Sequence, residues 1–299
     1  MAAGREEQVV RARRLRIELR QLRRDQAQTQ ADVARAMDWS NSKVIRIESG
    51  DARITVSDLR ALLAHYGVGD AERIERLVEM ARQSRNDPWK DFKDVHQAAS
   101  LKYFGFEASA SLVRAFSPAL IHGLLQTEEY ARALAADTFE WDERETERRW
   151  EARQRRQELH ERPSSPEMFF VLDEAVIRRE VGGAGVMRRQ LERLQELARS
   201  GHLSLRVIPF TRGAHLGLTG PFVILEFPNP DDDDVLYLEN VMGEVTREET
   251  EVTAKYTDRF FKLEAAALSE SETSKLIDAA IEDMSGPAPD RRRSAATPP

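Results

Sequence analysis

The sequence predicts a mainly α-helical N-terminal half and an α+β C-terminal domain with a small sheet. In the N-terminal half, apolar residues recur at spacings of three and four, and polar capping residues precede several of these segments. From residue 168 onward, short runs of branched and aromatic residues are bounded by Gly or Pro, which is typical of strands. A chain of 299 residues is long enough for two or three domains.

Composition excludes several classes of protein. The chain has no cysteine, so it has no disulfides, thiolate metal sites or cysteine nucleophiles. The sequence has no apolar run long enough to cross a bilayer, and its first ten residues, MAAGREEQVV, do not resemble a signal peptide. We therefore expect a cytoplasmic protein with no membrane partner.

The formal net charge of −7 is unevenly distributed along the chain. Residues 1–84 contain 16 Lys and Arg against 13 Asp and Glu, which gives +3, so the remainder carries −10. A mildly basic segment attached to an acidic body indicates a DNA-binding domain joined to a domain with another role.

Residues 29–50, TQADVARAMDWSNSKVIRIESG, have the pattern of two short helices joined by a tight turn. Thr29 and Ser40 stand where the two helices need N-caps, and Gly50 stands where the second helix needs a left-handed residue after its end. These signals together predict a helix-turn-helix.

The second of these helices predicts a surface that reads DNA. Val44 and Ile47 face inward, which leaves an amide, a hydroxyl and two cations outside: Asn41, Ser42, Lys43 and Arg46. Amide and guanidinium groups make paired hydrogen bonds to base edges in the major groove, and lysine reaches phosphate. The partner indicated is double-stranded DNA.

This arrangement resembles the helix-turn-helix of the Cro/repressor-like (XRE) family. The residues that carry the resemblance are Gln30-Ala31, Val44-x-x-Ile47-Glu48, Ser49-Gly50 and the downstream Ile54-Thr55-x-x-x-Leu59-x-x-Leu62. The chain departs from the family at Asp38, which replaces the common turn glycine, and at Ile45, which occupies a usually polar outward position.

The resemblance implies a repressor-like bundle of about five helices and a set of DNA contacts. It assigns base contacts to Asn41, Ser42 and Arg46, and phosphate contacts to Gln30, Lys43 and Arg53. With the helix cap included, the expected DNA-binding residues are Gln30, Ser40, Asn41, Ser42, Lys43, Arg46 and Arg53.

Changes in composition divide the chain into four parts. We expect a helix-turn-helix domain over 1–84, a helical middle segment over 85–167, an α+β regulatory or partner-binding domain over 168–285 and a disordered tail over 286–299. Strands are expected at 168–172, 203–210, 221–227 and 235–239, and helices at 173–179, 187–200, 250–267 and 269–283.

Two segments allow alternative interpretations. The basic helix from about Arg5 to Asp25 carries arginines that either contact phosphate or are simply solvated: Arg11, Arg13, Arg14, Arg16, Arg20, Arg23 and Arg24. The aromatic segment from Trp89 to Phe106 is either core or a partner surface, and core is the commoner case.

The body also resembles a known family. Segments such as FSPALIHGLLQTEEYARAL, FFVLDEAVIRREVGG and RVIPFTRGAHLGLTGPFVILEF are similar to the regulatory domain of actinomycete WhiJ-like regulators. This resemblance implies a transcriptional regulator that pairs with a small acidic partner protein of the BldB-like kind, in an antitoxin-like arrangement.

No pattern in the sequence indicates an enzyme. The six histidines have no metal-ligand spacing, and Gly182 to Gly185 lack the dinucleotide fingerprint. Asp231 to Asp234 are interpreted as a solvated acidic turn, and His215 is the one histidine whose loop position suits a pocket. We predict no catalytic residues, no metal and no cofactor.

Two roles are open for the body. In the first, it binds a small partner protein through apolar residues that flank the loop TRGAHLGLTG: Phe210, Leu216, Leu218 and Phe222. In the second, it senses a small molecule in a cavity lined by Phe169, Phe222 and Tyr237. A homodimer is expected in either case, paired through the body or through the aromatic segment, because one recognition helix covers only a few base pairs.

Overall fold

The structure is a computed structural model that describes residues 8–50, 52–83, 89–139, 141–158, 165–201, 203–229, 232–240 and 243–284. The chain divides into two compact units, and one short segment from the second half of the chain belongs to the first unit. Unit 1 contains residues 1–111 and 225–235, and unit 2 contains residues 112–224 and 236–299. The predicted disordered tail and the expected boundary at residues 84–88 lie outside the described residues.

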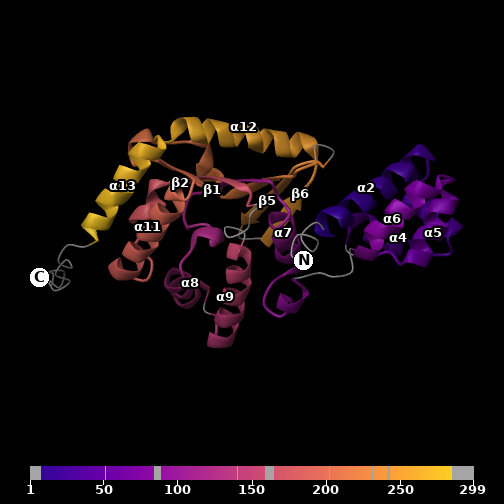
Figure 1. Ribbon diagram of the computed structural model, residues 1–299, viewed down its shortest axis with the longest axis horizontal. Coiled ribbons are helices and arrows are strands. Elements are labelled where there is room, and N and C mark those ends of the chain that lie inside the picture. The colour runs from indigo at the N-terminus through magenta and orange to yellow at the C-terminus, as the bar shows by residue number, and fades with distance from the viewer. Residues whose placement is uncertain are drawn as a thin grey trace, which may run out of the picture. The chain divides into compact units, whose positions relative to one another are not determined.

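Unit 1 contains the predicted helical bundle (Figure 1). Its five helices are α2 (Gln8–Asp25), α3 (Gln30–Ala36), α4 (Asn41–Ser49), α5 (Val56–His65) and α6 (Ala71–Gln83). The bundle buries one continuous apolar core that draws on every helix, and its members include Leu15, Leu19, Val33, Val44, Ile47, Leu59, Leu63 and Val78. The apolar residues that recur at spacings of three and four in the sequence therefore form this core.

The caps of the helix-turn-helix are confirmed. Thr29 forms a capping box with Asp32, whose carboxylate accepts the Thr29 N–H at 3.0 Å, and these hydrogen bonds lower the pKa of Asp32. The Ser40 hydroxyl oxygen accepts the Lys43 N–H at 3.2 Å, and Gly50 has φ of 87°. Asp38, at the turn position where the resembled family has glycine, has φ of 55°, in the left-handed region that Asp tolerates better than most residues.

The arginines of α2 are mostly engaged within the protein. Arg13 is 1% exposed; its guanidinium lies 5.8 Å from the Phe106 ring and 5.6 Å from the Phe227 ring, and it donates to the backbone carbonyls of Asp233 and Asp234. Arg13 is therefore a core residue of unit 1 and does not present a cation to phosphate.

One residue of the acidic turn is also engaged within the protein. Arg14 donates two hydrogen bonds to the carboxylate of Asp232, which is buried. The interpretation of this turn as a solvated one is therefore wrong for Asp232, whereas Asp233 is exposed; Asp231 lies outside the described residues. Asp232 has low exposure because its carboxylate pairs with Arg14 of α2.

The aromatic segment is core. The 3₁₀ turn η1 (Lys90–Phe92) and the helix α7 (Ala98–Glu107) bury their aromatic side chains, namely Trp89, Phe92, Tyr103, Phe104 and Phe106. The alternative of a partner or dimer surface at this segment is therefore wrong, because an interface needs side chains that a second chain can reach.

Unit 2 is built around the predicted α+β arrangement. The strands are β1 (Leu112–Ser117), β2 (Glu167–Asp173), β3 (Leu203–Ile208), β4 (Phe222–Glu226), β5 (Val235–Asn240) and β6 (Gly243–Arg247). They form a six-stranded sheet in the order β3-β2-β1-β4-β5-β6, in which β1, β2 and β3 run parallel and β5 and β6 antiparallel. The α+β class is confirmed.

Two of these strands were not predicted. β1 lies within the segment expected to be helical, so that segment is not purely helical. β1 is central in the sheet and has little polar alternation, and such short buried strands are hard to distinguish from helix by periodicity. β6, GEVTR, is polar because it is an edge strand.

Helices cover both faces of the sheet (Figure 1). On one face lies α12 (Thr250–Ala266), whose Phe260 and Leu263 join Phe116, Val171 and Phe222 in a buried cluster. On the other face lie α8 (Glu128–Leu134), α9 (Glu143–Gln157) and α11 (Ala184–Arg199). The remaining elements of unit 2 are η2 (Gly123–Leu125), η3 (Ala135–Phe139), α10 (Glu174–Arg178), η5 (Phe210–Arg212), η6 (Leu216–Thr219) and α13 (Glu270–Asp283).

Within the described part of the chain, every helix is too short or too polar to cross a membrane.

Candidate nucleic-acid interface

The exposed face of α4 carries most of the residues predicted to contact DNA. Val44, Ile47 and Glu48 are at most 5% exposed, and they fix which face of the helix points inward. The opposite face is exposed and presents Asn41, Ser42, Ile45, Arg46 and Ser49. An amide, hydroxyls and a guanidinium on a short helix match the donor and acceptor pattern of base edges in the major groove.

A buried carboxylate holds α4 in this orientation. Arg23 of α2 donates to both oxygens of Glu48, at 2.7 and 3.0 Å, and Gln30 at the start of α3 donates to the same carboxylate at 2.8 Å. Arg23 also donates to the carbonyl of Gln28 at 2.9 Å. The hydrogen bond to Glu48 raises the pKa of Arg23, and burial together with the Glu48 charge raises the pKa of Tyr66 to about 12. Three segments of the bundle thus converge on one anion.

This role of Glu48 was not predicted from the sequence. The signal was present, because Glu48 follows Val44 by four residues and therefore shares its inward face. A carboxylate on an otherwise apolar inward face needs buried donors. Arg23, on α2, supplies them from 25 residues away.

The structure separates the other predicted DNA-binding residues, which are the three phosphate contacts and the cap residue Ser40, into two groups. Gln30 and Lys43 are half-buried and bound internally: Gln30 to Glu48, and Lys43 to Asp58 at 3.0 Å, with its amine 3.9 Å from the Trp39 ring. Ser40 and Arg53 are exposed. The Ser40 oxygen caps α4 by accepting, so its hydroxyl hydrogen can still be donated to a phosphate.

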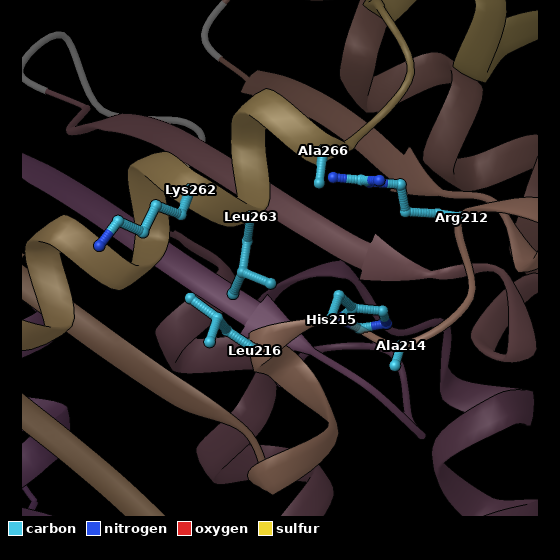
Figure 2. Close-up of a pocket in the computed structure, with 7 residues that line it drawn as sticks. All are labelled: Arg212, Ala214, His215, Leu216, Lys262, Leu263 and Ala266. Carbon is cyan, nitrogen blue, oxygen red and sulfur yellow. The ribbon is translucent and has the colours of Figure 1, made fainter.

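A second surface lies in unit 2, where an open hollow of about 410 Å³ is formed between η6 and α12 (Figure 2). Its lining residues are Arg212, Ala214, His215, Leu216, Lys262, Leu263 and Ala266. Figure 2 shows the apolar side chains of Leu216 and Leu263 pointing toward one another. The expectation that His215 suits a pocket is met.

His215 is fixed in this hollow. Its Nε2 lies 2.9 Å from the Asp173 carboxylate, and its Nδ1 accepts the Gly217 N–H at 3.2 Å. Because Nδ1 accepts, the proton lies on Nε2 and is donated to Asp173. Both ring nitrogens therefore have partners, and the imidazole is a structural part of the η6 turn.

Three of the four predicted partner-binding residues are exposed on η5 and η6, and one of them, Leu216, lines this hollow. Phe210 is 58% exposed, Leu216 45% and Leu218 64%. Phe222 is a correction: it is 2% exposed and packs in the core between the sheet and α12. The inward face of β4 requires an apolar residue at that position. Phe222 and Tyr237 are buried, and neither they nor Phe169 lines the hollow, so the predicted sensor cavity is not at this place.

The bundle, its caps and the exposed polar face of α4 define a class of protein. A family model described as a helix-turn-helix domain matches residues 14–76, which span α3, α4 and α5, most of α2 and the first part of α6. The chain is therefore a helix-turn-helix protein of the class that binds DNA and regulates transcription.

The family follows from the rest of the chain. A second model, described as a domain of unknown function (DUF5753), matches residues 101–279, which is more than half of the chain, and the chain belongs to this family. No curated protein and no solved structure matches it.

Replacing Glu48 by alanine tests the buried carboxylate. In Glu48→Ala, the Arg23 guanidinium, whose side chain is 13% exposed, loses its anion, so we expect the free energy of unfolding to fall by about 3–5 kcal/mol. Chemical denaturation followed by circular dichroism measures this change.

The matched control is Glu75→Ala, which removes an exposed ion pair with Arg60 in the same bundle and should change stability far less. Equal effects of the two substitutions would contradict the role assigned to Glu48.

Proposed function

We propose that the chain regulates transcription by reading a specific DNA sequence with the exposed face of α4. Asn41, Ser42 and Arg46 contact base edges in the major groove. Gln30, Ser40, Lys43 and Arg53 contact the phosphates on either side. The observation that carries the proposal is the buried Glu48 network, which holds α4 with these polar side chains outward.

The roles of Arg46 and Lys43 differ in a measurable way. Arg46→Ala should weaken binding to the specific site by about 1–3 kcal/mol and binding to random duplex much less, because a guanidinium pairs with a particular base. Lys43→Ala should weaken all sequences alike and flatten the salt dependence, because lysine neutralises phosphate. Fluorescence anisotropy on a selected site and on a scrambled duplex, at several salt concentrations, measures both.

Equal loss on both duplexes would make Arg46 a phosphate contact. A changed sequence preference in Lys43→Ala would refute its assigned role. Since Lys43 already pairs with Asp58, Asp58→Asn serves as a control: it frees the Lys43 charge and should strengthen nonspecific binding.

We also propose that the protein binds its operator as a homodimer. A helix of nine residues covers only a few base pairs, and two half-sites about one helical turn apart supply the missing affinity. The pairing surface is assigned to the body, because the aromatic segment is buried. Analytical ultracentrifugation of the protein–DNA complex should give two chains per duplex; one chain per duplex, or a footprint over a single half-site, would refute the dimer.

The body, in this proposal, binds a small acidic partner protein in an antitoxin-like manner, as its resemblance to WhiJ-like actinomycete regulators suggests. The surface around the hollow supports this assignment through its chemistry. Its exposed apolar residues can form an interface centre, and Arg212, Arg259 and Lys262 place cations beside them on a body that is acidic as a whole. The competing function is a ligand-sensing repressor, which the volume of about 410 Å³ favours because it lies in the range of small-molecule pockets.

Leu218→Asp distinguishes the two functions. The substitution removes an exposed apolar contact and adds a charge that repels an acidic partner, so copurification of the small acidic protein from the native cell should fall about tenfold or more. Quantitative mass spectrometry of tagged full-length protein gives the measurement. Phe139→Asp is the matched control, because Phe139 is also exposed but lies on η3 and not on the η6 turn that carries Leu218, and it should retain the partner.

Retention of the same partner by Leu218→Asp would remove this surface from the proposal. Recovery of a small molecule without any acidic protein would favour the ligand-sensing function instead.

A further inference from the structure

Ile45 is an apolar side chain in the middle of the polar face of α4. It is 43% exposed, whereas the other apolar residues of this helix, Val44 and Ile47, are almost fully buried. Ile45 belongs neither to the apolar core of the bundle nor to the partly buried residues that pack against it. The position therefore gains nothing from core packing.

Local structure does not explain the isoleucine either. A branched side chain lowers helix propensity slightly, and a polar or charged residue at an exposed helix position would be at least as favourable. Since each residue turns the helix by roughly 100°, Ile45 falls between Asn41 and Arg46 around the helix axis. It lies among the groups to which the proposed function assigns base contacts.

One of the four bases presents an apolar group in the major groove. Thymine alone among the four bases carries a C5-methyl group in the major groove, beside the donors and acceptors of the base pair. We propose that Ile45 contacts the C5-methyl group of a thymine and so selects an A·T pair at one position of each half-site. This inference rests on the proposed function and adds an apolar contact to its polar ones.

The surroundings of Ile45 favour this occupant over another protein. Its neighbours on the exposed face of α4 are Asn41, Ser42, Arg46 and Ser49, so the face has no apolar centre. A protein interface needs several clustered apolar or aromatic side chains, whereas a single isoleucine suits a single methyl group. In the described part of unit 1, the other large apolar side chain with comparable exposure is Ile17, which lies on α2.

The test removes the methyl group and nothing else. Full-length protein first selects its site from a random duplex pool, and each thymine of that site is then replaced in turn by deoxyuridine, which pairs as thymine does but lacks the C5-methyl group. Loss of one buried methyl should weaken wild-type binding roughly three- to fivefold at one position of each half-site, by the free energy of burying one carbon. Other positions should be unaffected.

The matching variants show whether Ile45 is the residue responsible. Ile45→Ala should bind the thymine site more weakly than wild type and should no longer distinguish thymine from deoxyuridine at that position, whereas Ile45→Val should still distinguish them. Ile17→Ala, the exposed isoleucine on α2, should keep the full wild-type difference. Thermal melting of each variant checks that the bundle remains folded.

The outcomes separate this inference from the proposed function. Specific binding without any thymine-to-deoxyuridine effect overturns the inference and leaves the proposed function intact. The same deoxyuridine effect in Ile45→Ala and in wild type also overturns it, since the methyl contact then belongs to another residue. Failure to select any sequence overturns the proposed function and the inference together.

Discussion

The side chain of Glu48 is almost fully buried, and a carboxylate in that position is stable only when donors surround it. Arg23 and Gln30 supply the donors, one from α2 and one from the start of α3. Because the carboxylate belongs to α4, its three hydrogen bonds fix the rotation of that helix about its own axis. The apolar contacts of Val44 and Ile47 give the helix an inward side, and the directional hydrogen bonds limit how far it can turn.

Because Glu48 holds α4 from its buried side, the exposed residues of this helix do not have to hold it in place. Its exposed side chains, namely Asn41, Ser42, Ile45, Arg46 and Ser49, contribute nothing to the apolar core of the bundle. A surface that reads bases must present its groups at fixed positions, and the anchoring in this protein is done from the opposite side. Lys43 is likewise held by neighbouring groups, because Asp58 and the Trp39 ring fix the position of its amine in the absence of a ligand.

Local features were predictable from the sequence, and distant ones were not. The capping roles of Thr29 and Ser40 and the left-handed Gly50 depend on neighbours within a few residues, so the helix-turn-helix and its outward side chains follow from the pattern. Phe222 was misassigned because an apolar residue beside a loop has the same sequence signature whether its strand buries it or not. The acidic turn was misread for a similar reason: Asp232 looks solvated until Arg14, 218 residues earlier, is placed beside it. Strand β1 was not predicted because it forms by pairing with β2, some fifty residues later in the chain.

The large sequence separation of Arg14 and Asp232 also means that Arg14 is synthesised well before its partner. A ribosome adds about 5–20 residues per second, so the 218 residues between the two side chains take roughly 10–40 s to synthesise. The apolar core of the helical bundle is complete at Ala81, long before the acidic turn exists. A bundle that folds before this turn is synthesised lacks the carboxylate that later neutralises Arg14, so it is more positively charged than in the finished chain. Since positive charge strengthens phosphate binding, we expect such a bundle to attract nucleic acid nonspecifically more than the finished chain does.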